Sequence, residues 1–258
     1  MLITPIYKGQ GLGNQLHCII TTRCLALDKG YEFGVAFPER FKGFFFNSIW
    51  LPEAKGVEVE VEGQPPTQLP EGYSYYRELS SDYDPAVFNI KDNTVLHGNL
   101  QGEKYIEKHK DDIRHWLEVE PLDMPNDLCV INFRGGEYVG VREFFLPNDY
   151  WQDAVDNMLK INPNMKFEVH TDDVETAQKF FPDYKCVHDI ALNWRSIRYA
   201  KYVILSNSSF GWMPAWLGNA YIIAPKFWQR YNLEYWCLEQ NKTKGFWYQD
   251  KDGNLEQL

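Results

Sequence analysis

Apolar and polar positions alternate along the second half of the chain in a way that predicts strands and helices in turn. Short apolar runs bounded by turn residues indicate buried strands, and apolar residues that recur every three to four positions indicate helices. Strands that alternate with helices at this spacing predict a parallel sheet with ligands bound beyond the carboxyl ends of its strands. We expect strands at residues 128–133, 165–170, 184–187, 202–205 and 221–224, and helices at residues 149–159, 172–181, 192–200 and 208–217.

The first half of the chain shows the same signals less regularly. An apolar strand at residues 2–7 runs through a glycine loop into a helix that we expect to begin at Asn14. Scattered prolines between residues 51 and 92 predict irregular structure with short strands. Two prolines and the absence of an apolar period make residues 120–127 the expected domain boundary. Further strands are expected at residues 31–37 and 94–97, and a further helix at residues 105–117.

These elements predict an α/β protein built from two halves. We place the N-terminal half at residues 1–122 and the C-terminal half at residues 123–258. We expect the C-terminal segment, residues 226–258, to pack back on the N-terminal half. This segment contains an aromatic run at residues 227–236, which could instead stack on acceptor sugars.

Composition excludes some classes of partner and indicates the cellular compartment. The chain has 258 residues, 44% of them hydrophobic, which is ample for a packed core. Its formal net charge of -10 and the lack of a Lys/Arg run argue against a nucleic-acid partner or an anionic membrane surface. No apolar window is long enough to span a membrane, and the first residues lack a leader pattern, so no integral membrane segment is expected. Five scattered cysteines without a C-x-x-C pair favour a soluble protein in a reducing cytoplasm.

Three loops at expected strand ends carry polar residues. Arg134 leaves a buried strand directly into a glycine pair, which suits a bidentate contact to phosphate, although an arginine at a strand end can equally pair with a nearby acid. Asp172 and Asp173 lie at a strand-to-helix junction, where Asp172 with Glu175 also fits a capping box.

The third loop precedes an aromatic helix. Its hydroxyls, Ser208 and Ser209, can cap that helix, or they can form a phosphate cradle with the free amides of the helix start. The N-terminal glycine loop offers a similar arrangement. Gly11 and Gly13 let the backbone approach a ligand closely, and Asn14 is the side chain we expect to make contact. Together these loops indicate an anionic ligand that carries a sugar or a nucleotide.

Six motifs in register resemble the family 11 glycosyltransferases. That family contains the α-1,2-fucosyltransferases and is related to the α-1,6- and protein O-fucosyltransferases. The similarity runs in order from about residue 9 to residue 225. The motifs are G-L-G-N-Q-L (11–16), G-N-L-Q-G-E-K-Y (98–105), I-N-F-R-G-G-E-Y (131–138), L-P-N-D-Y-W (146–151), F-E-V-H-T-D-D-V-E (167–175) and S-N-S-S-F-G-W-M-P-A-W-L (206–217).

The resemblance implies a GT-B architecture, in which two Rossmann-like halves face each other across a cleft. It also implies an inverting, metal-independent fucosyltransferase that uses GDP-fucose, needs no cofactor and transfers fucose to a glycan acceptor. The donor would lie on the C-terminal half and the acceptor toward the N-terminal half. The residues expected to bind the donor are Gly11, Gly13, Asn14, Arg134, Asp172, Asp173, Ser208, Ser209 and Phe210.

The chain departs from the family pattern H-x-R-R-G-D at several positions. Arg134 is kept, but Asn132 stands in place of the His, Gly135 in place of the second Arg, and Glu137 in place of the Asp. These changes leave two alternatives open. The first is a transferase for a different nucleotide sugar, and the second is a catalytically silent module that binds a nucleotide sugar or a glycan.

An inverting transferase also needs a base for the acceptor hydroxyl and a charge for the leaving diphosphate. Arg134 is expected to supply the charge. For the base we rank Glu143 slightly above Glu137, and either can equally be an ordinary solvated acid of the loop. His17 and His97 are the acceptor-side candidates, although an ordinary core or surface histidine is the commoner role for His17.

Overall fold

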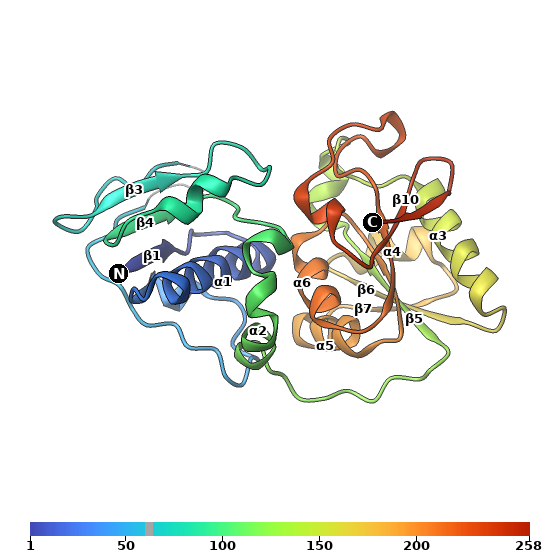
Figure 1. The fold of residues 1–258 in the computed structure, drawn as a ribbon. Coiled ribbons are helices and arrows are strands. Elements are labelled where there is room, and N and C mark those ends of the chain that lie inside the picture. Colours follow the sequence, from blue (N-terminus) through green and yellow to red (C-terminus); the bar gives the residue numbers. More distant parts are fainter. Residues whose placement is uncertain (60–63) are drawn as a thin grey trace. The chain divides into compact units, whose positions relative to one another are not determined.

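The computed structural model describes residues 1–59 and 64–258 and divides the chain into two compact units. Unit 1 comprises Met1–Val119 and unit 2 comprises Glu120–Leu258. The division falls next to the proline-containing segment that the sequence marks as a boundary. Each unit carries its own mainly parallel sheet with flanking helices (Figure 1), so the expectation of two Rossmann-like α/β halves is confirmed.

Unit 1 is built on a four-stranded sheet in the order β2-β1-β4-β3, and all of its neighbouring strands are parallel. The chain places β2 on one side of β1 and the later strands on the other, so the topology switches direction between β1 and β4. The strands are β1 (Leu2–Pro5), β2 (Phe33–Ala36), β3 (Ser74–Arg77) and β4 (Thr94–His97).

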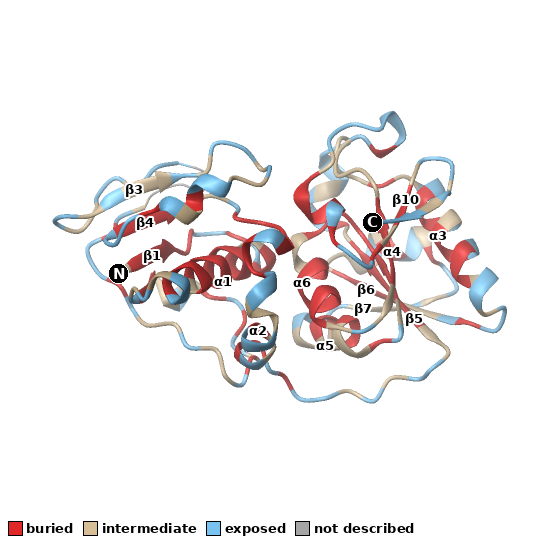
Figure 2. Cartoon of the chain, viewed as in Figure 1, coloured by how far each residue is buried: buried red, intermediate tan, exposed pale blue. Residues whose placement is uncertain are grey.

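One long helix covers the sheet of unit 1. Helix α1 (Leu12–Lys29) is buried along most of its length (Figure 2), which agrees with its run of apolar and small residues. It ends at Gly30, whose left-handed conformation (φ 66°) closes the last turn. Helix α2 (Lys110–Trp116) is shorter than predicted, because the two preceding turns at Glu103–Tyr105 and Glu107–His109 are 3₁₀.

Unit 2 contains a seven-stranded sheet in the order β11-β10-β9-β8-β5-β6-β7. Every neighbouring pair is parallel except β10 and β11. Without β11, the order is that of a Rossmann sheet, with the topological switch point between β5 and β8. The strands are β5 (Leu128–Phe133), β6 (Lys166–Thr171), β7 (Lys185–Val187), β8 (Tyr202–Leu205), β9 (Tyr221–Pro225), β10 (Trp247–Gln249) and β11 (Leu255–Gln257).

Four helices connect these strands, as the right-handed crossovers of a parallel sheet require. They are α3 (Asn148–Ile161), α4 (Val174–Phe180), α5 (Ile190–Tyr199) and α6 (Ser209–Leu217). The core between α3, α4 and the sheet is rich in aromatic residues: Phe133 lies at ring-centroid distances of 5.2 Å from Trp151 and 5.8 Å from Phe181. This packing fixes the carboxyl end of β5, where Arg134 follows.

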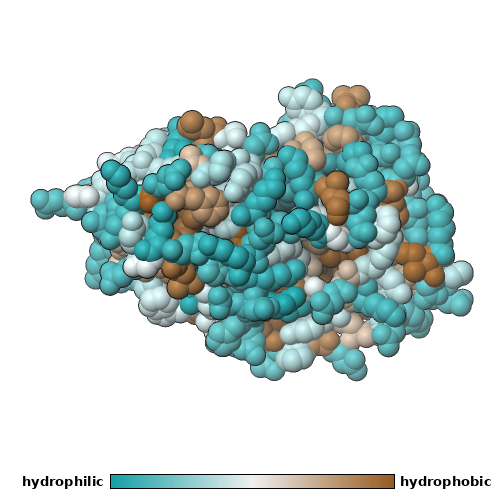
Figure 3. All heavy atoms as spheres, in the orientation of Figure 1, coloured by the Kyte–Doolittle hydropathy of each residue, from teal (hydrophilic) through white to brown (hydrophobic). Residues whose placement is uncertain are grey.

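The C-terminal segment 226–258 extends the sheet of unit 2. Strand β10 pairs with β9, and β11 adds an antiparallel edge. Figure 3 shows that hydrophobic residues on the visible face lie as scattered patches among hydrophilic ones. Among the helices of residues 1–59 and 64–258, none combines the length and the apolar character that a membrane crossing requires.

Candidate functional site

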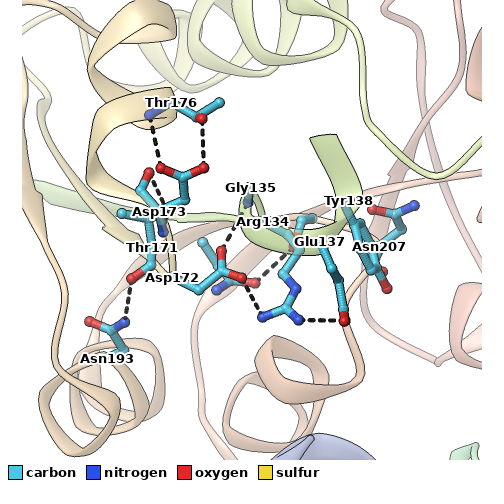
Figure 4. A network of polar contacts seen from close by, with 12 residues as sticks. Arg134, Gly135, Glu137, Tyr138, Thr171, Asp172, Asp173, Thr176, Asn193 and Asn207 are labelled. Carbon is cyan, nitrogen blue, oxygen red and sulfur yellow. Dashed lines mark hydrogen bonds and ion pairs between the residues drawn. The ribbon is translucent and has the colours of Figure 1, made fainter. Parts of the chain in front are cut away.

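The carboxyl ends of β5 and β8 meet at the switch point of the unit 2 sheet. Ser206, just after β8, donates its backbone N–H to the carbonyl of Asn132 at 3.0 Å. Figure 4 shows Arg134 after β5, Asp172 and Asp173 after β6, and Asn207 after β8 at this edge. Ser208 and Ser209 follow Asn207 directly in the chain. In sheets of this topology the ligand crevice lies at this point.

Arg134 lies at the centre of this edge. Its guanidinium contacts Asp172 at 2.6 Å and Glu137 at 2.9 Å, and it lies 5.3 Å from the centroid of the Tyr138 ring. The side chain is 29% exposed, so solvent and ligands can reach it. The sequence left open whether Arg134 pairs with an acid, and the structure shows this pairing with two carboxylates, those of Asp172 and Glu137. Both pairs are partly solvated, and pairs of this kind contribute about 0–1 kcal/mol.

Asp172 and Asp173 have different roles. Asp172 Oδ1 accepts the backbone N–H of Gly135 at 2.9 Å, so this acid ties the loop after β5 to the end of β6. Asp173 is the N-cap of α4 and accepts from the backbone N–H of Thr176 at 3.0 Å and from its hydroxyl at 2.6 Å. Hydrogen bonds from Thr176 lower the pKa of Asp173. The capping box predicted for Asp172 is wrong, because the helix begins one residue later.

Positions 135 and 136, directly after Arg134, need glycine because Asp173 and Asp172 pack closely against them. A Cβ at Gly135 would lie 2.7 Å from the Cβ of Asp173, and a Cβ at Gly136 would lie 2.5 Å from Asp172 Oδ2. Gly136 also has a positive φ of 44°. In this geometry position 135 has no room for the second arginine of the family pattern.

The start of α6 faces the same edge. Ser208 is its N-cap, but no side-chain hydrogen bond caps the helix. The first amides of a helix have no acceptor within the helix itself, so they are directed toward this edge. Phe210 packs edge-on against Trp194 with ring centroids 5.9 Å apart. A Cβ at Gly211 would lie 2.3 Å from Asn132 Oδ1, which shows how closely α6 approaches the end of β5.

Asn207 is a buried residue of this edge that the sequence analysis missed. It is 1% exposed and donates its side-chain N–H groups to the carbonyls of Phe144 at 2.8 Å and Trp228 at 2.6 Å. The Oδ1 atom is buried and has no hydrogen-bond partner among the residues that the structure describes. Asn207 thus joins the loop after β5 to the loop after β9. Its position two residues after an apolar strand was the available signal.

Glu143 lines a cavity of about 570 Å³ in unit 2, whereas Glu137 does not. The Glu143 carboxylate lies 3.6 Å from Arg230 and is 41% exposed, while Glu137 is 75% exposed and pairs with Arg134. The two acids considered as bases therefore differ in surroundings. The cavity is lined by Arg142, Glu143, Phe145, Pro147, Arg230, Tyr231, Asn232 and Leu233.

The glycine loop of unit 1 is shorter than expected. Helix α1 begins at Leu12 rather than Asn14, with Gly11 as N-cap, so Gly13 lies buried inside the first turn. Asn14 accepts a hydrogen bond from the Gln101 amide at 2.9 Å. Within residues 1–59 and 64–258, no atom lies within 4 Å of a Cβ built at Gly11.

The two acceptor-side histidines have contrasting surroundings. His17 is 0% exposed, and burial lowers its pKa to about 3, so it is a neutral interior group. The expectation that its side chain faces an acceptor is therefore wrong for this structure. His97 ends β4 and hydrogen-bonds to the Tyr75 hydroxyl through Nδ1. It lines a cavity of about 220 Å³ at the carboxyl edge of the unit 1 sheet, together with Tyr7, Gln10, Arg77, Glu78, Leu79, Ser80, Ser81, Gly98 and Asn99.

No cluster of three or more His, Cys, Asp or Glu side chains placed to hold a metal ion occurs within residues 1–59 and 64–258.

Sequence comparison gives two curated relatives, and no family model matches the chain. The α-1,2-colitosyltransferase of Escherichia coli is 26% identical over 167 residues, which cover 54% of this chain and 58% of that protein. The O-antigen biosynthesis glycosyltransferase WbnK of Escherichia coli is 24% identical over 170 residues, which cover 54% of this chain and 56% of that protein. The chain therefore matches a little more than half the length of these relatives. Among solved structures, the E. coli heptosyltransferase WaaC with ADP aligns with a TM-score of 0.46 at 11% identity, over 93% of this chain and 92% of that one.

Proposed function

We propose that the chain is an inverting glycosyltransferase that transfers a sugar from a nucleotide diphosphate donor to a hydroxyl of a glycan, with GDP-fucose as the donor we favour. The observation that carries this proposal is that Arg134 after β5 and the start of α6 after β8 follow neighbouring strands at the switch point of a Rossmann-ordered sheet. A guanidinium and the backbone amides at the start of a helix are groups that bind phosphate. Both curated relatives are named as sugar transferases.

In this proposal the diphosphate of the donor lies along the edge formed by Arg134 and Ser208–Phe210. Arg134 turns from its carboxylate partners to the phosphates, and the developing charge on the leaving group is stabilised by the guanidinium and the helix start. Asp172 and Asp173 act indirectly: one positions Arg134 and Gly135, and the other caps α4. In unit 1, we propose that Gly11 and Asn14 contact the donor.

The transfer step displaces the nucleoside diphosphate at the anomeric carbon. The acceptor oxygen attacks that carbon, the bond from carbon to the phosphate oxygen breaks, and the diphosphate leaves with the electron pair. The acceptor proton passes to a carboxylate. We favour Glu143 over Glu137, because Glu143 lines a cavity large enough for a sugar, whereas Glu137 is engaged by Arg134 at 2.9 Å. The proposed mechanism uses no metal.

A different nucleotide sugar is the second candidate donor. Asn132 and Gly135 depart from the fucosyltransferase pattern, and one relative is named for the transfer of colitose. A catalytically silent binding module is the third candidate, favoured by the two carboxylates that already occupy Arg134.

A panel of donors separates these candidates. The purified chain is incubated with GDP-fucose and with other GDP, UDP and ADP sugars, with and without a chelator, and nucleotide release is measured. We expect release from GDP-fucose that the chelator does not change. Release from a different donor alone would replace GDP-fucose in the proposal. Thermal stabilisation by GDP without release from any donor would support the silent module, and loss of release on chelation would contradict the metal-independent mechanism.

A further inference from the structure

The cavity beside Glu143 has the size and lining of a ligand site. Its volume of about 570 Å³ lies within the range of roughly 300–1,000 Å³ that is typical of small-molecule pockets. It opens between the loop after β5 and the loop after β9, at the carboxyl edge of the unit 2 sheet. Neither Arg134 nor the start of α6 lines it, so it is separate from the proposed diphosphate site.

Positive charge predominates in this cavity. Two guanidinium groups, those of Arg142 and Arg230, line it together with one carboxylate, that of Glu143. Arg230 approaches Glu143 only to 3.6 Å and lies 5.5 Å from the centroid of the Tyr235 ring. Arg142 forms no ion pair with any residue in 1–59 or 64–258. The lining therefore carries one uncompensated positive charge, in a chain whose formal net charge is -10.

The walls of the cavity suit a ring with an apolar face. Phe145, Pro147 and Tyr231 supply apolar and aromatic surface, and Asn232 adds an amide. Leu233 is 73% exposed at the same site. Sugar rings have both an apolar face of C–H groups and a rim of hydroxyls, so aromatic walls with a few polar groups match them.

Strained backbone surrounds the cavity and is held in place by buried contacts. Arg230, Glu234 and Trp236 all adopt left-handed conformations, with φ of 48°, 53° and 54°. Such conformations are costly for residues other than glycine and persist only where surrounding structure enforces them. The Arg230 N–H donates to the Glu143 carbonyl at 2.5 Å, and Asn207 holds the carbonyls of both loops. The two arginines are thus presented from loops that are fixed to each other.

We propose that this cavity binds the acceptor and that the acceptor sugar it takes carries a carboxylate. Arg142 and Arg230 bind the carboxylate, the apolar walls contact the ring, and Glu143 accepts a hydrogen bond from a hydroxyl. This inference rests on the proposed function, because it assigns the substrate class of the same transferase. It is tested by binding alone, without a donor, so that its failure and that of the transferase proposal give different results.

The experiment measures the binding of simple glycosides to the whole chain. Methyl β-D-glucuronide, methyl β-D-glucoside and inorganic phosphate are titrated by calorimetry into the wild type and into the variants Arg142→Gln and Arg230→Asn. Asparagine is chosen at position 230 because it tolerates the left-handed backbone. Lys179→Gln is the matched control, since it removes one positive charge from an exposed pair on α4 of the same unit. Thermal melting verifies that each variant is folded.

We expect the glucuronide to bind at least about tenfold more tightly than the glucoside, and each arginine variant to lose about tenfold in glucuronide affinity, as charged hydrogen bonds of this kind predict. The control should bind as the wild type does, and GDP affinity should stay unchanged in the arginine variants. Equal binding of the two glycosides, or a glucuronide affinity that folded arginine variants retain, would overturn the proposal. Phosphate binding as tight as that of glucuronide would also overturn it, because the site would then recognise charge rather than a sugar. A loss of GDP affinity on Arg134→Ala with intact glucuronide binding would leave this inference standing.

Discussion

The carboxyl edges of the two sheets resemble each other in topology and differ in what their polar groups do. In unit 1, Glu78 is engaged by the backbone N–H groups of Asn99 and Leu100 at 2.7 and 3.0 Å, and burial raises its pKa. The acid therefore organises the loop after β4. In unit 2, the loop after β5 presents Arg134, whose partners are two partly solvated carboxylates.

We infer from this difference that a glycine-rich strand–loop–helix connection is not enough to identify a phosphate site. The loop before α1 starts a long helix, but the residues at its edge, such as Asn14 and Gln101, bond to each other. The loop before α6 lacks a glycine run but lies next to a guanidinium. We infer that the residues that bind the phosphates belong to unit 2.

The largest effect is expected from Arg134→Ala. Removing a cation that stabilises a leaving diphosphate should lower turnover of the preferred donor by about 100- to 1,000-fold. Melting temperature should change little, because the lost pairs are partly exposed. Steady-state rates and thermal melting are measured together, and Arg114→Ala in unit 1, which also loses an exposed ion pair, is the control. Wild-type turnover in a folded Arg134→Ala variant would contradict the proposal that unit 2 stabilises the leaving diphosphate.

A pair of glycine substitutions compares the two helix starts directly. Gly211→Ala places a Cβ 2.3 Å from Asn132 Oδ1 and should destabilise the chain by about 1–3 kcal/mol, as overpacking does. Gly11→Ala meets no atom of the described residues within 4 Å and should be neutral to within about 0.5 kcal/mol. Denaturant unfolding measures both. If Gly11→Ala is the more destabilising substitution, the conclusion that a Cβ fits at position 11 without a clash is wrong.

The pH dependence of stability tests the burial of His17. The pKa of His17 is about 3 in the folded chain and near 6.5 when unfolded, so between these values the unfolded chain binds more protons. The contribution of His17 is complete above pH 6.5 and is lost progressively as the pH falls toward 3. We expect His17→Gln to flatten the decline in unfolding free energy between pH 6.5 and 4.5, with the exposed His115→Gln as control. An unchanged slope in His17→Gln would show that the ring is accessible.

The smallest effect is expected from Asp172→Asn. The new amide oxygen can still accept the Gly135 N–H, but the carboxylate no longer competes for Arg134. GDP should therefore bind about two- to fivefold more tightly, in line with the small free energy of a partly exposed ion pair. Calorimetric titration measures this change. A loss as large as that of Arg134→Ala would instead show that the Asp172 charge is needed in the site.

The sequence predicted the elements of unit 2 well because their signals are local. The strand at 128–133 is a continuous apolar run and has the bounds of β5, and the strand at 202–205 has those of β8. By contrast, β3 was hidden in a proline-rich stretch. The three-residue strands β10 and β11 were missed, since they are too short to show a period.

The candidate site was predictable in position but not in its contacts. Parallel topology was enough to bring Arg134, Asp172 and Ser208 to one edge. The local sequence does not distinguish Asp173 from Asp172 as the N-cap of α4, because either residue fits the start of a helix. The role of Asn207 and the cavity beside Glu143 depend on loops distant in sequence, which periodicity does not describe.

A comparison of GDP binding with GMP binding tests most directly whether the diphosphate binds at the carboxyl edge of the unit 2 sheet. The two ligands differ by one phosphate, so their affinity ratio reports the contacts to the terminal phosphate. We predict that GDP binds the wild type more tightly than GMP by about tenfold or more, the value of a charged hydrogen-bonded pair, and that the ratio falls close to one in Arg134→Ala. A GDP-to-GMP ratio that is the same in wild type and variant would contradict the assignment of the diphosphate to the carboxyl edge of unit 2.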